Sequence, residues 1–492
     1  MADIIIIQPE IGKWDYLRTQ PSLPLNLLHA ATFVDKEYQI KFIDQRVDKN
    51  WQLTLKKELA KPILCVGLTS YSGKMIAHAL EISEFIKEQS KVPVIWGGVH
   101  ASLLPEQTLK NRYIDIVVQG EGEVTFLELA RALEKGKSLK GLEGVWFKCN
   151  GEVYRNPPRS FLNLNELPEI PYHLVDVHRY MPVYRHRPSM PLQTSRGCIC
   201  KCSYCINSIY RYSEWRPLTA ENTIKKLKYL VSKFQVNSIY IIDDNFFVDL
   251  ERVKKITQGI INENLNIEWY VQGGPDFNSA EKIGDDLLGL LEKSGCVKIS
   301  CGIESGSPRI REMINKDGSL EVIGKINRKF SKYNILVYYT FMTGLPGETI
   351  IDLKRTIRFL FKLLKENKNA RSWPIHAFIP YPATPLTQSL NEAGYKLPST
   401  LEEWMEYDFD NFSFNNFSYI SNGLKKILMT NLLYLAPLFV DSKFKEYELP
   451  KIIEFFALVY RPIARFRLRH LFLRFMVEKK MMSLFLKLKS KS

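Results

Sequence analysis

Three cysteines that lie close together in the sequence could bind a metal cluster. Cys198, Cys202 and Cys205 follow the spacing C-x3-C-x2-C within the stretch 194–207, TSRGCICKCSYCIN. A thiol next to a metal loses its proton readily, and the resulting thiolate is a soft ligand that suits iron. Three ligands instead of four leave one metal position open, whereas a structural zinc site usually closes all four. The spacing therefore predicts an iron–sulfur cluster with one iron free to bind another group.

The same residues allow two other interpretations. The cysteines could bind zinc, or they could be buried thiols without a metal. In addition, Cys200 lies inside the motif and creates an alternating C-x-C-x-C pattern. The flanking residues favour the register of Cys198, Cys202 and Cys205, so we interpret Cys200 as a bystander.

The motif resembles that of the radical S-adenosylmethionine (SAM) superfamily, whose pattern is C-x3-C-x-aromatic-C. Tyr204 fills the aromatic place directly before Cys205, and the resemblance implies that it contacts SAM. The resemblance implies a [4Fe–4S] cluster held by Cys198, Cys202 and Cys205, with a fourth iron that chelates the amino and carboxylate groups of SAM. It also implies one-electron cleavage of SAM to a 5′-deoxyadenosyl radical, with an electron donor such as flavodoxin or ferredoxin.

Later segments match further motifs of this family in the same order. Asp243 and Asp244 end an expected strand at the place where the family contacts the SAM amino group, and a carboxylate there can accept hydrogen bonds from an ammonium group. Glu304 and Ser305, within GIESGS, match a position near the methionyl or ribose groups of SAM. The resemblance therefore implies that these four residues contact SAM.

Two more segments complete the match. Gly344 and Glu348, within FMTGLPGE, resemble the loop that packs on the adenine of SAM. Residues 380–385, PYPATP, resemble the motif of the final strand. Arg309 and Arg311 follow GIESGS, and either could pair with the SAM carboxylate.

The elements that must position these residues are short strands that alternate with helices. Expected strands lie at 238–246, 268–274, 297–307, 335–348 and 373–386, with helical stretches between them. Repeated βα units predict a barrel with its functional groups at the carboxyl ends of the strands. The resemblance implies the partial (β/α)6 barrel of the superfamily, which is open on one side for substrate.

Residues 1–145 show the same alternation, with apolar strands expected at 3–7, 39–44, 63–70, 93–98 and 114–120. Nearly continuous apolar strands separated by helices predict a doubly wound parallel sheet that is covered on both faces. Ligands bind such sheets at the carboxyl ends of the strands. Polar and glycine-rich turns stand there, namely Thr69-Ser70, Gly97-Gly98 and Gly120-Glu121-Gly122.

This region resembles the cobalamin-binding domain that precedes many radical SAM cores. The matching pieces are P-L-x-L-L near Pro24, I-D at 43–44, the GG-x-H turn and the G-E-G-E turn. The resemblance implies cobalamin contacts at Thr69, Ser70, Gly97, Gly98, Gly120, Glu121 and Gly122.

One expected motif is absent from this region. The D-x-H-x-x-G motif, whose histidine binds cobalt in many such domains, does not follow the first strand, and His29 and His78 fall within expected helices. We therefore expect no histidine ligand on the lower face of the cobalt. A domain that binds no corrinoid also stays open.

The boundaries follow from these patterns. We expect a cobalamin-binding-like domain at 1–145, a linker at 146–190, the radical SAM core at 191–390 and a helical, basic C-terminal region at 391–492. The linker contains a predicted hairpin turn at Asn150-Gly151 and several prolines.

The positive charge is concentrated near the C-terminus. Residues 421–492 contain 15 Lys and Arg against 5 Asp and Glu, so +10 of the net charge of +15 lies there. Aromatic and aliphatic residues interleave with these cations over 452–489 at a spacing that predicts an amphipathic helix, started or broken at Pro462. The helix could cap the barrel, lie on an anionic membrane surface or bind nucleic acid. No nucleic-acid recognition module is visible, so we expect no nucleic-acid partner.

Cysteine usage and apolar stretches also indicate the cellular compartment. The eight cysteines do not form the pattern of a secreted disulfide framework, and the N-terminus, MADIIIIQPE, reads as a strand without the basic region of a signal peptide. The sequence contains no uncharged apolar stretch of about 18 residues, so we expect no membrane-spanning helix. We expect a cytoplasmic protein, with contact to a membrane surface left open.

These patterns and resemblances together predict an enzyme with a [4Fe–4S] cluster, SAM and cobalamin. In related methylases, a second SAM methylates cob(I)alamin and the substrate radical takes the methyl group. Methylation of an unactivated carbon in a small-molecule or lipid-like substrate is the first interpretation. Radical cyclisation, oxidation or C–C coupling is the alternative within the family, an RNA-modifying radical enzyme is a third option, and a non-catalytic corrinoid or redox sensor belongs to another class. The sequence assigns no catalytic residue.

Overall fold

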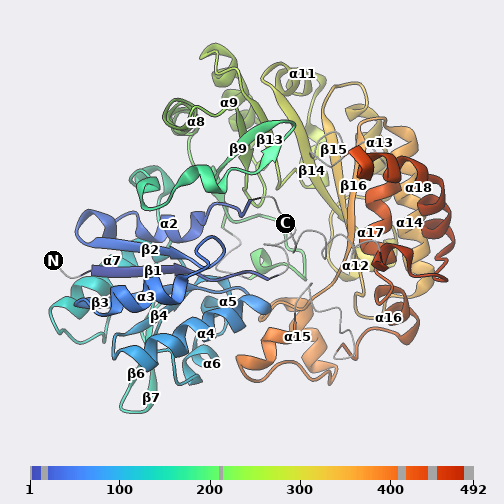
Figure 1. The fold of residues 1–492 in the computed structure, drawn as a ribbon. Helices are drawn as coiled ribbons and strands as arrows, with labels where there is room; N and C mark the ends of the chain where they lie inside the picture. Colours follow the sequence, from blue (N-terminus) through green and yellow to red (C-terminus); the bar gives the residue numbers. More distant parts are fainter. Residues whose placement is uncertain (1–2, 13–19, 210–213, 408–416, 441–450, 481–492) are drawn as a thin grey trace. The chain divides into compact units, whose positions relative to one another are not determined.

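The computed structural model describes residues 3–12, 20–209, 214–407, 417–440 and 451–480. The chain forms two compact units, each built around one sheet of seven strands (Figure 1). The first unit comprises Met1–Pro182 and Lys396–Asn411, and the second comprises Val183–Tyr395 and Phe412–Ser492.

The sheet of the first unit has the strand order β2-β1-β3-β4-β5-β6-β7. Strands β1 to β5 pair in parallel, and β6 and β7 add an antiparallel hairpin that turns at Asn150-Gly151, as predicted. In such an order the ligand-binding crevice lies where the connections diverge, between β1 and β3. The strands are β1 Asp3–Gln8, β2 Gln39–Asp44, β3 Ile63–Thr69, β4 Val94–Gly97, β5 Ile116–Val118, β6 Val145–Cys149 and β7 Glu152–Arg155.

Helices cover both faces of this sheet, which confirms the doubly wound prediction. Side chains alternate along a strand, so Ile4 and Ile6 of β1 face one side, where they share a core with Leu27 and Phe126. These two partners come from α2 (Leu25–Ala31) and α7 (Gly122–Glu134). On the other face, α3 (Trp51–Leu59) and α4 (Lys74–Gln89) contact each other. Two short helices, α5 (Gly98–Leu103) and α6 (Pro105–Lys110), follow β4.

The sheet of the second unit is a half-barrel with the strand order β16-β15-β14-β13-β12-β9-β8. Strands β9 and β12 to β16 run parallel, and the short β8 is antiparallel at one edge. Because β16 and β8 end the sheet, it does not close on itself, as the partial (β/α)6 barrel requires. The strands are β8 Val183–Tyr184, β9 Arg187–Leu192, β12 Ser238–Ile241, β13 Glu268–Val271, β14 Cys296–Glu304, β15 Leu336–Thr343 and β16 Ala370–Ala377.

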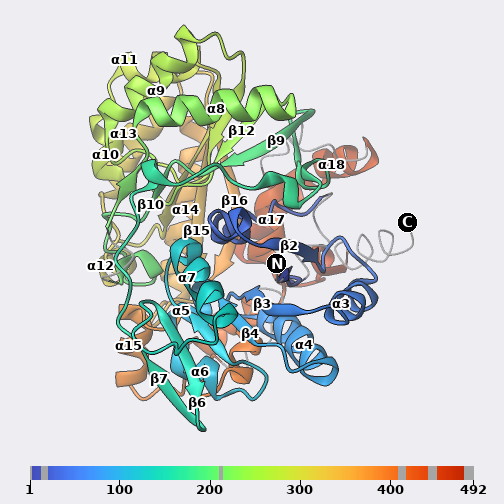
Figure 2. The ribbon, with the colours of Figure 1, turned by 90° about the vertical axis from the view of Figure 1, so that its left-hand side faces the viewer.

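Amphipathic helices follow the strands of the half-barrel and cover its outer surface. Helices α8 and α9, for example, lie side by side there (Figure 2). Each begins with a side-chain cap, from Thr219 and Asp249 respectively, which satisfies a backbone N–H that the first turn leaves unpaired. The helices are α8 Ala220–Phe234, α9 Leu250–Asn262, α10 Phe277–Lys282, α11 Asp285–Lys293, α12 Pro308–Met313, α13 Leu320–Phe330, α14 Ile350–Glu366 and α15 Pro385–Glu392.

The C-terminal region adds three helices, α16 (Asn422–Leu428), α17 (Leu432–Val440) and α18 (Lys451–His470). Helix α17 packs along β16, and α18 packs on α17 and α14. One prediction is wrong here, because α18 neither starts nor breaks at Pro462 but continues through it. Its packing on neighbouring helices confirms that one face of the helix caps the second unit.

The turns after β3 and β4 approach each other so closely that only glycine fits at position 98. Gly98 has a φ of +87°, and a Cβ atom there would lie 2.5 Å from Thr69 Oγ1 and 2.7 Å from the Ser70 carbonyl oxygen. Gly136 also has a positive φ, +57°, but no atom lies within 4 Å of its would-be Cβ.

We therefore expect Gly98→Ala to lower the free energy of unfolding by about 3 kcal/mol, the sum of left-handed backbone strain and overpacking. Gly136→Ala adds only the backbone strain, so it should cost about 1 kcal/mol. Thermal unfolding of the two variants beside the parent chain measures the difference. Equal shifts in the midpoint would contradict the close approach of the two turns.

Candidate active site

The three motif cysteines lie on one short loop between β10 (Ser195–Arg196) and a 3-10 turn that begins at Ile206. Cys202 is buried, whereas Cys198 and Cys205 are half-buried. Burial raises the pKa of the Cys205 thiol to about 12, while a hydrogen bond with Cys200 lowers the pKa of Cys198 to about 7. In the described part of the chain, no three His, Cys, Asp or Glu side chains gather around the position of a single metal ion.

Ser203 holds this loop in place from its centre. Its backbone N–H donates to the carbonyl oxygen of Ile314 at 3.0 Å, and its carbonyl oxygen accepts from the N–H of Leu386 at 2.8 Å. Its hydroxyl reaches the carbonyl oxygen of Met313 at 3.4 Å. The loop is thus tied to the end of α12 and to the first turn of α15. The hydrogen bond from Leu386 places the preceding segment, PYPATP, next to the cysteine loop.

The two aspartates after β12 have different surroundings. Asp243 is 2% exposed and accepts three hydrogen bonds of 2.6 Å, from Thr194 N, Thr194 Oγ1 and Ser195 Oγ. Asp244 is exposed and accepts one bond of 3.2 Å from the N–H of Gly197 through Oδ2. Asp243 therefore fastens the segment that leads into the cysteine loop. Asp244, directly beside that loop, keeps acceptor capacity for a ligand ammonium group.

Glu304, Tyr204 and Lys316 form a polar group at the loop, in which Glu304 is buried and the other two are half-buried. Glu304 ends β14 with a φ of +66°, and it forms a hydrogen bond with the Tyr204 hydroxyl. Burial raises the pKa of both Glu304 and Tyr204. Burial disfavours the charged form of Lys316, yet the nearby Cys202, Glu304 and Asp317 raise its pKa. A cation is thus held among the thiol and carboxyl groups of the site.

The sequence did not single out Lys316. It follows α12 within the polar turn Asn315-Lys316-Asp317-Gly318, a composition typical of an exposed turn. Only the hydrogen bonds of this turn to the cysteine loop, including Asn315 Nδ2 to the Lys201 carbonyl oxygen at 2.8 Å, bring it to the site.

Several residues expected at the SAM site are tied into the protein itself. The hydroxyl of Ser305 bonds Thr356 Oγ1 at 3.2 Å, and Arg309 pairs with Asp352 at 2.5 Å. The guanidinium group of Arg311 donates to backbone carbonyl oxygens, among them that of Gly318 at 2.8 Å. These contacts tie Ser305 and both arginines to neighbouring loops of the second unit.

Glu348 organises the loop that contains Gly344. Its Oε2 accepts from the N–H of Gly344 at 2.6 Å and from Thr343 Oγ1 at 3.0 Å. Its Oε1 is buried and has no hydrogen-bond partner among the described residues. Burial raises the pKa of Glu348 to about 7. A buried acceptor without a partner is costly, so this oxygen suits a ligand that donates a hydrogen bond.

Two glycines after β13 closely approach the backbone that follows β12 and the middle of β14. A Cβ atom on Gly273 would lie 1.8 Å from the Asp243 carbonyl oxygen, and one on Gly274 would lie 1.9 Å from that of Ser300. These contacts exclude any side chain at either position. The two glycines thus allow the turn after β13 to pack directly against the backbone of its neighbours.

Aromatic rings surround a buried lysine inside the half-barrel. Lys298 Nζ lies 4.3, 4.1, 5.2 and 5.9 Å from the ring centroids of Tyr184, Tyr270, Tyr338 and Trp373. These distances are those of cation–π contacts. Since Lys298 lies near the amino end of β14, the cluster fills the interior on the side away from the cysteine loop. Tyr339, the neighbour of Tyr338, points outward and donates to Asn327 Oδ1 at 2.9 Å.

In the first unit, the polar turns gather at the carboxyl edge of the parallel sheet. The N–H of Ser70 donates to the Gly97 carbonyl oxygen at 3.0 Å, and Thr69 Oγ1 accepts from Asn26 Nδ2 at 3.0 Å. The Gly120 N–H donates to Ser102 Oγ at 3.0 Å, which joins the turn after β5 to helix α5. The predicted turns therefore share one edge.

Glu121 and Gly122 are tied to neighbouring segments of the same unit. Glu121 Oε2 accepts from the N–H of Leu162 at 3.0 Å. A Cβ atom on Gly122, the first residue of α7, would lie 3.4 Å from the Ala30 Cβ, so this glycine allows α7 and α2 to pack closely. Both residues therefore have structural contacts at the edge where the sequence predicts cobalamin.

His100, in the turn after β4, is fully buried at the same edge. Its Nδ1 lies 2.8 Å from Ser72 Oγ, and its ring packs on the edge of Trp404 with centroids 5.9 Å apart. Burial lowers the pKa of His100 to about 4, so the ring is neutral at pH 7. Among the described residues, neither His100 Nε2 nor Trp404 Nε1 has a hydrogen-bond partner. The edge thus holds unsatisfied polar atoms that a polar ligand could satisfy.

The comparisons with known proteins agree with this fold. The sequence matches the radical SAM superfamily over residues 192–360 and the B12 binding domain over residues 19–130. The chain belongs to the radical SAM superfamily, among the members that carry a B12-binding domain, and it is an enzyme whose cofactors are a [4Fe–4S] cluster, SAM and cobalamin.

One relative supports this assignment, and two solved structures share the fold. An uncharacterized methyltransferase of Pyrococcus horikoshii, PH0819, is 32% identical over 345 residues, which cover 69% of this chain and 73% of the relative. The structure of the cobalamin-dependent radical enzyme OxsB superposes with a TM-score of 0.72 at 18% identity and covers 100% of this chain and 75% of OxsB. The methyltransferase TsrM of Kitasatospora setae, with tryptophan and a SAM analogue bound, gives a TM-score of 0.69 at 17% identity, covering 90% and 89%.

The residues present fit these cofactors. Three thiols on a loop anchored by Ser203 are suitable ligands for an iron–sulfur cluster. The exposed carboxylate of Asp244 and the unpartnered Glu348 Oε1 are suitable acceptors for the amino groups of SAM. At the edge of the first sheet, the buried His100 Nε2 and Trp404 Nε1 lack hydrogen-bond partners among the described residues. When bound, the cluster and SAM supply a carbon-centred radical, and cobalamin supplies a carrier for a methyl group.

The register of the cysteines is tested by two variants. We expect the triple substitution Cys198→Ala, Cys202→Ala and Cys205→Ala to abolish iron binding in anaerobically prepared protein, because all three cluster ligands are removed. Cys200→Ser should retain about the parental iron content. Iron and sulfide analysis with the visible absorption spectrum measures both, and loss of iron in Cys200→Ser would contradict the register.

The different surroundings of the two aspartates predict opposite effects. Asp244→Asn should weaken SAM binding about tenfold or more, since a charge-assisted hydrogen bond contributes about 1.5–3 kcal/mol, and it should leave the unfolding midpoint unchanged. Asp243→Asn should cost about 3 kcal/mol of stability, because an amide cannot accept all three hydrogen bonds. Equilibrium dialysis with SAM and thermal unfolding separate the two effects. If Asp243→Asn weakened SAM binding and Asp244→Asn lowered stability, the two assigned roles would be contradicted.

Proposed function

We propose that the protein methylates an unactivated carbon of a small-molecule substrate. The observation that carries the proposal is that one chain joins a B12-binding sheet to a radical SAM half-barrel over most of the length of a relative described as a methyltransferase. A radical source alone would serve many reactions, whereas a methyl carrier in the same chain favours methyl transfer.

In this proposal the residues of the second unit generate and contain the radical. Cys198, Cys202 and Cys205 hold the cluster, and Asp244 binds the ammonium group of SAM. Glu304 and Tyr204 position the remaining polar groups of SAM, and Lys316 balances the negative charge of the thiolates. Buried, preorganised groups of this kind orient a ligand without further rearrangement.

The interior of the half-barrel supports an apolar or aromatic substrate. Tyr184, Tyr270, Tyr338 and Trp373 surround Lys298 on the side away from the cysteine loop, so a substrate would lie between this cluster and the SAM site. Packed aromatic walls exclude water, which protects a carbon radical from side reactions. A lipid-like or isoprenoid substrate would suit such walls.

In the first unit, the proposal places cobalamin at the carboxyl edge of the sheet. Thr69, Ser70 and the paired glycines after β4 form a close-packed turn there, and His100 presents an unsatisfied nitrogen. We do not assign this histidine to cobalt, because its ring lies between Ser72 and Trp404. The expectation of no histidine ligand below the cobalt is therefore kept as part of the proposal.

The electron donor and compartment complete the proposal. A small acidic carrier such as flavodoxin or ferredoxin suits a chain with a net charge of +15. The eight cysteines are all free thiols, which suits a reducing cytoplasm. In the described part of the chain, no helix combines the length and apolar character needed to cross a bilayer.

Product analysis tests methyl transfer directly. The anaerobic enzyme, loaded with iron and cobalamin, is given a chemical reductant, SAM with a deuterated methyl group and a small-molecule extract of its host cells. We expect both S-adenosylhomocysteine and 5′-deoxyadenosine to form, and a new product to carry the deuterated methyl group. In the proposed reaction one SAM donates its methyl group and leaves S-adenosylhomocysteine, and a second is cleaved to the radical and leaves 5′-deoxyadenosine. Both nucleosides are therefore required.

Two other results would replace the proposal. 5′-Deoxyadenosine without S-adenosylhomocysteine would favour radical cyclisation, oxidation or C–C coupling. Bound cobalt and iron with neither nucleoside formed would favour a corrinoid or redox sensor. The triple cysteine variant serves as the control for cleavage of SAM that does not depend on the cluster.

A further inference from the structure

Helix α18 packs with one face on the second unit and leaves apolar side chains exposed on another. Ala457, Tyr460, Ala464 and Leu468 are buried, as expected for the face that contacts α17 and α14. A second apolar set recurs at helical spacing and is half or more exposed: Phe455 at 65%, Leu458 at 59%, Val459 at 56%, Ile463 at 50% and Phe466 at 54%. These five residues are termed the outer stripe. Packing within the unit does not account for them.

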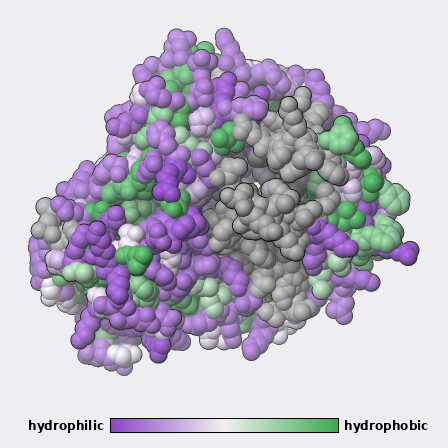
Figure 3. Space-filling model, in the orientation of Figure 1, coloured by the Kyte–Doolittle hydropathy of each residue, from purple (hydrophilic) through white to green (hydrophobic). Residues whose placement is uncertain are grey.

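The apolar surface continues beyond the end of the helix. Phe472, Phe475 and Met476 are 39%, 68% and 43% exposed. They are held in place by a buried ion pair, since Arg467 on α18 bonds both carboxylate oxygens of Glu478 at 2.9 Å. This pair folds the segment back onto the helix. Figure 3 shows apolar residues gathered on the side of the molecule where α18 lies in Figure 1.

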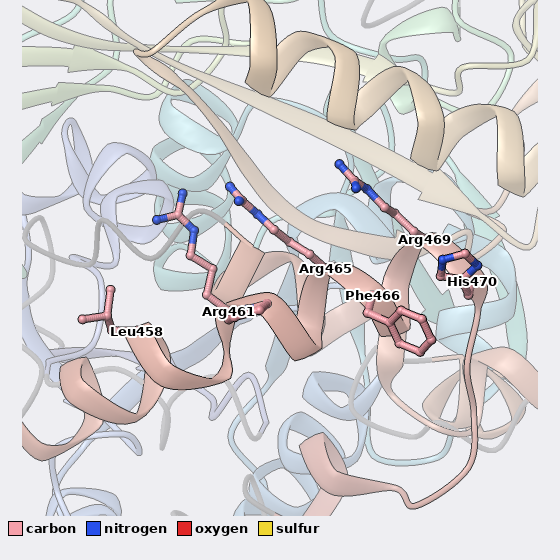
Figure 4. A pocket seen from close by; sticks show the side chains of 7 residues that line it. Leu458, Arg461, Arg465, Phe466, Arg469 and His470 are labelled. Carbon is pink, nitrogen blue, oxygen red and sulfur yellow. The ribbon is translucent and has the colours of Figure 1, made fainter.

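A row of arginines runs beside the outer stripe. Arg461, Arg465 and Arg469 recur every four residues, and their side chains extend from α18 in the same direction (Figure 4). Together with Leu458, Pro462, Phe466 and His470, they line a surface hollow of about 520 Å³. The row therefore adjoins the apolar side chains instead of lying on the opposite side of the helix.

Contacts within the unit hold the arginines in this row. The Nε atoms of Arg461 and Arg465 both donate to the Val440 carbonyl oxygen at 3.2 Å, at the end of α17. The guanidinium group of Arg469 stacks on the ring of Phe361, 4.4 Å from its centroid. Among the described residues, Arg461 thus contacts a carbonyl oxygen and Arg469 an aromatic ring, and neither pairs with a carboxylate. Their outer N–H groups therefore keep donor capacity for an anion.

An exposed apolar stripe flanked by cations fits a lipid bilayer with anionic headgroups. Such a helix lies in the plane of the membrane, with its apolar side chains among the acyl chains and its arginines at the phosphates. The composition agrees, because residues 421–492 carry +10 of the net charge of +15. We propose that α18 and the segment 471–476 bind the surface of an anionic membrane.

Two other occupants fit less well. In a symmetric pair of chains, each outer stripe would meet its own copy, and the arginine rows would then approach each other with like charge. Nucleic acid would match the arginines but would leave the exposed phenylalanines in water. A membrane surface satisfies both features at once. This proposal does not depend on methyl transfer, since it rests on a surface apart from the cysteine loop and the interior of the half-barrel.

Vesicle flotation with the full-length, cofactor-loaded protein tests the proposal. Vesicles of phosphatidylcholine alone are compared with vesicles that contain about 30% phosphatidylglycerol, at about 0.1 M salt. We expect the protein to float with the anionic vesicles and to remain unbound with the neutral ones. Raising the salt concentration should weaken binding, because the headgroup attraction is screened.

Two variants separate the apolar and the charged contributions. The triple variant Phe455→Asn, Ile463→Asn and Phe466→Asn should lower the fraction bound to anionic vesicles at least about tenfold. The double variant Arg461→Gln and Arg469→Gln should weaken binding about twenty-five-fold, because each cation near an anionic surface contributes about a factor of five. Leu53→Asn, on α3 in the first unit, is the matched control, since Leu53 is 69% exposed and lies outside the proposed surface. It should bind like the parent chain.

Three results of the flotation assay would overturn the proposal. These are equal binding to neutral and anionic vesicles, undiminished binding of both variants, and failure of the parent chain to bind anionic vesicles at all. Light scattering after size-exclusion chromatography is run beside the flotation assay. A dimer that the triple asparagine variant converts to monomer would assign the outer stripe to a second copy of the chain instead. Unchanged unfolding midpoints ensure that the variants report on the surface and not on folding.

Discussion

The candidate active site depends on one buried carboxylate. Asp243 receives hydrogen bonds from Thr194 and Ser195, immediately before the cysteine loop, and so joins that loop to the end of β12. Arg252 strengthens the connection by donating to the Thr194 carbonyl oxygen at 2.9 Å and to that of Leu218 at 2.7 Å. Burial raises the pKa of Asp243, while the hydrogen bonds and Arg252 act in the opposite direction. A buried charge persists only when it is paired in this way.

The rest of the site follows from where this connection places the cysteine loop. One end of the loop is fixed at the second strand of the half-barrel by Asp243, and its centre is fixed to α12 and α15 by Ser203. Asp244, the neighbour of Asp243, then stands beside the loop with a free acceptor. Lys316 lies beneath it with Glu304. A loop with no regular structure is thereby held in one conformation from several directions, which preorganises its thiols for ligation.

The two units use the same geometric rule for different ligands. In each, parallel strands end at one edge, and glycines allow the turns to approach more closely than any other residue could. Gly98 serves this purpose in the first sheet, and Gly273 and Gly274 serve it in the second. Close approach of the turns concentrates backbone and side-chain polar groups along one edge, which is where ligands bind in such sheets.

The sequence by itself determined the order and period of the elements and the register of the motifs. Alternating apolar strands and amphipathic helices predicted both sheets, and the hairpin at Asn150-Gly151 followed from turn chemistry, because these signals are local. The tertiary structure alone decided which members of each motif are available to a ligand. Asp243 and Asp244 are adjacent and chemically equal in the sequence, and only the contact with Thr194, 49 positions away, distinguishes them. For the same reason Lys316 and the exposed face of α18 carried no unambiguous signal, since burial and exposure depend on packing between segments that are distant along the chain.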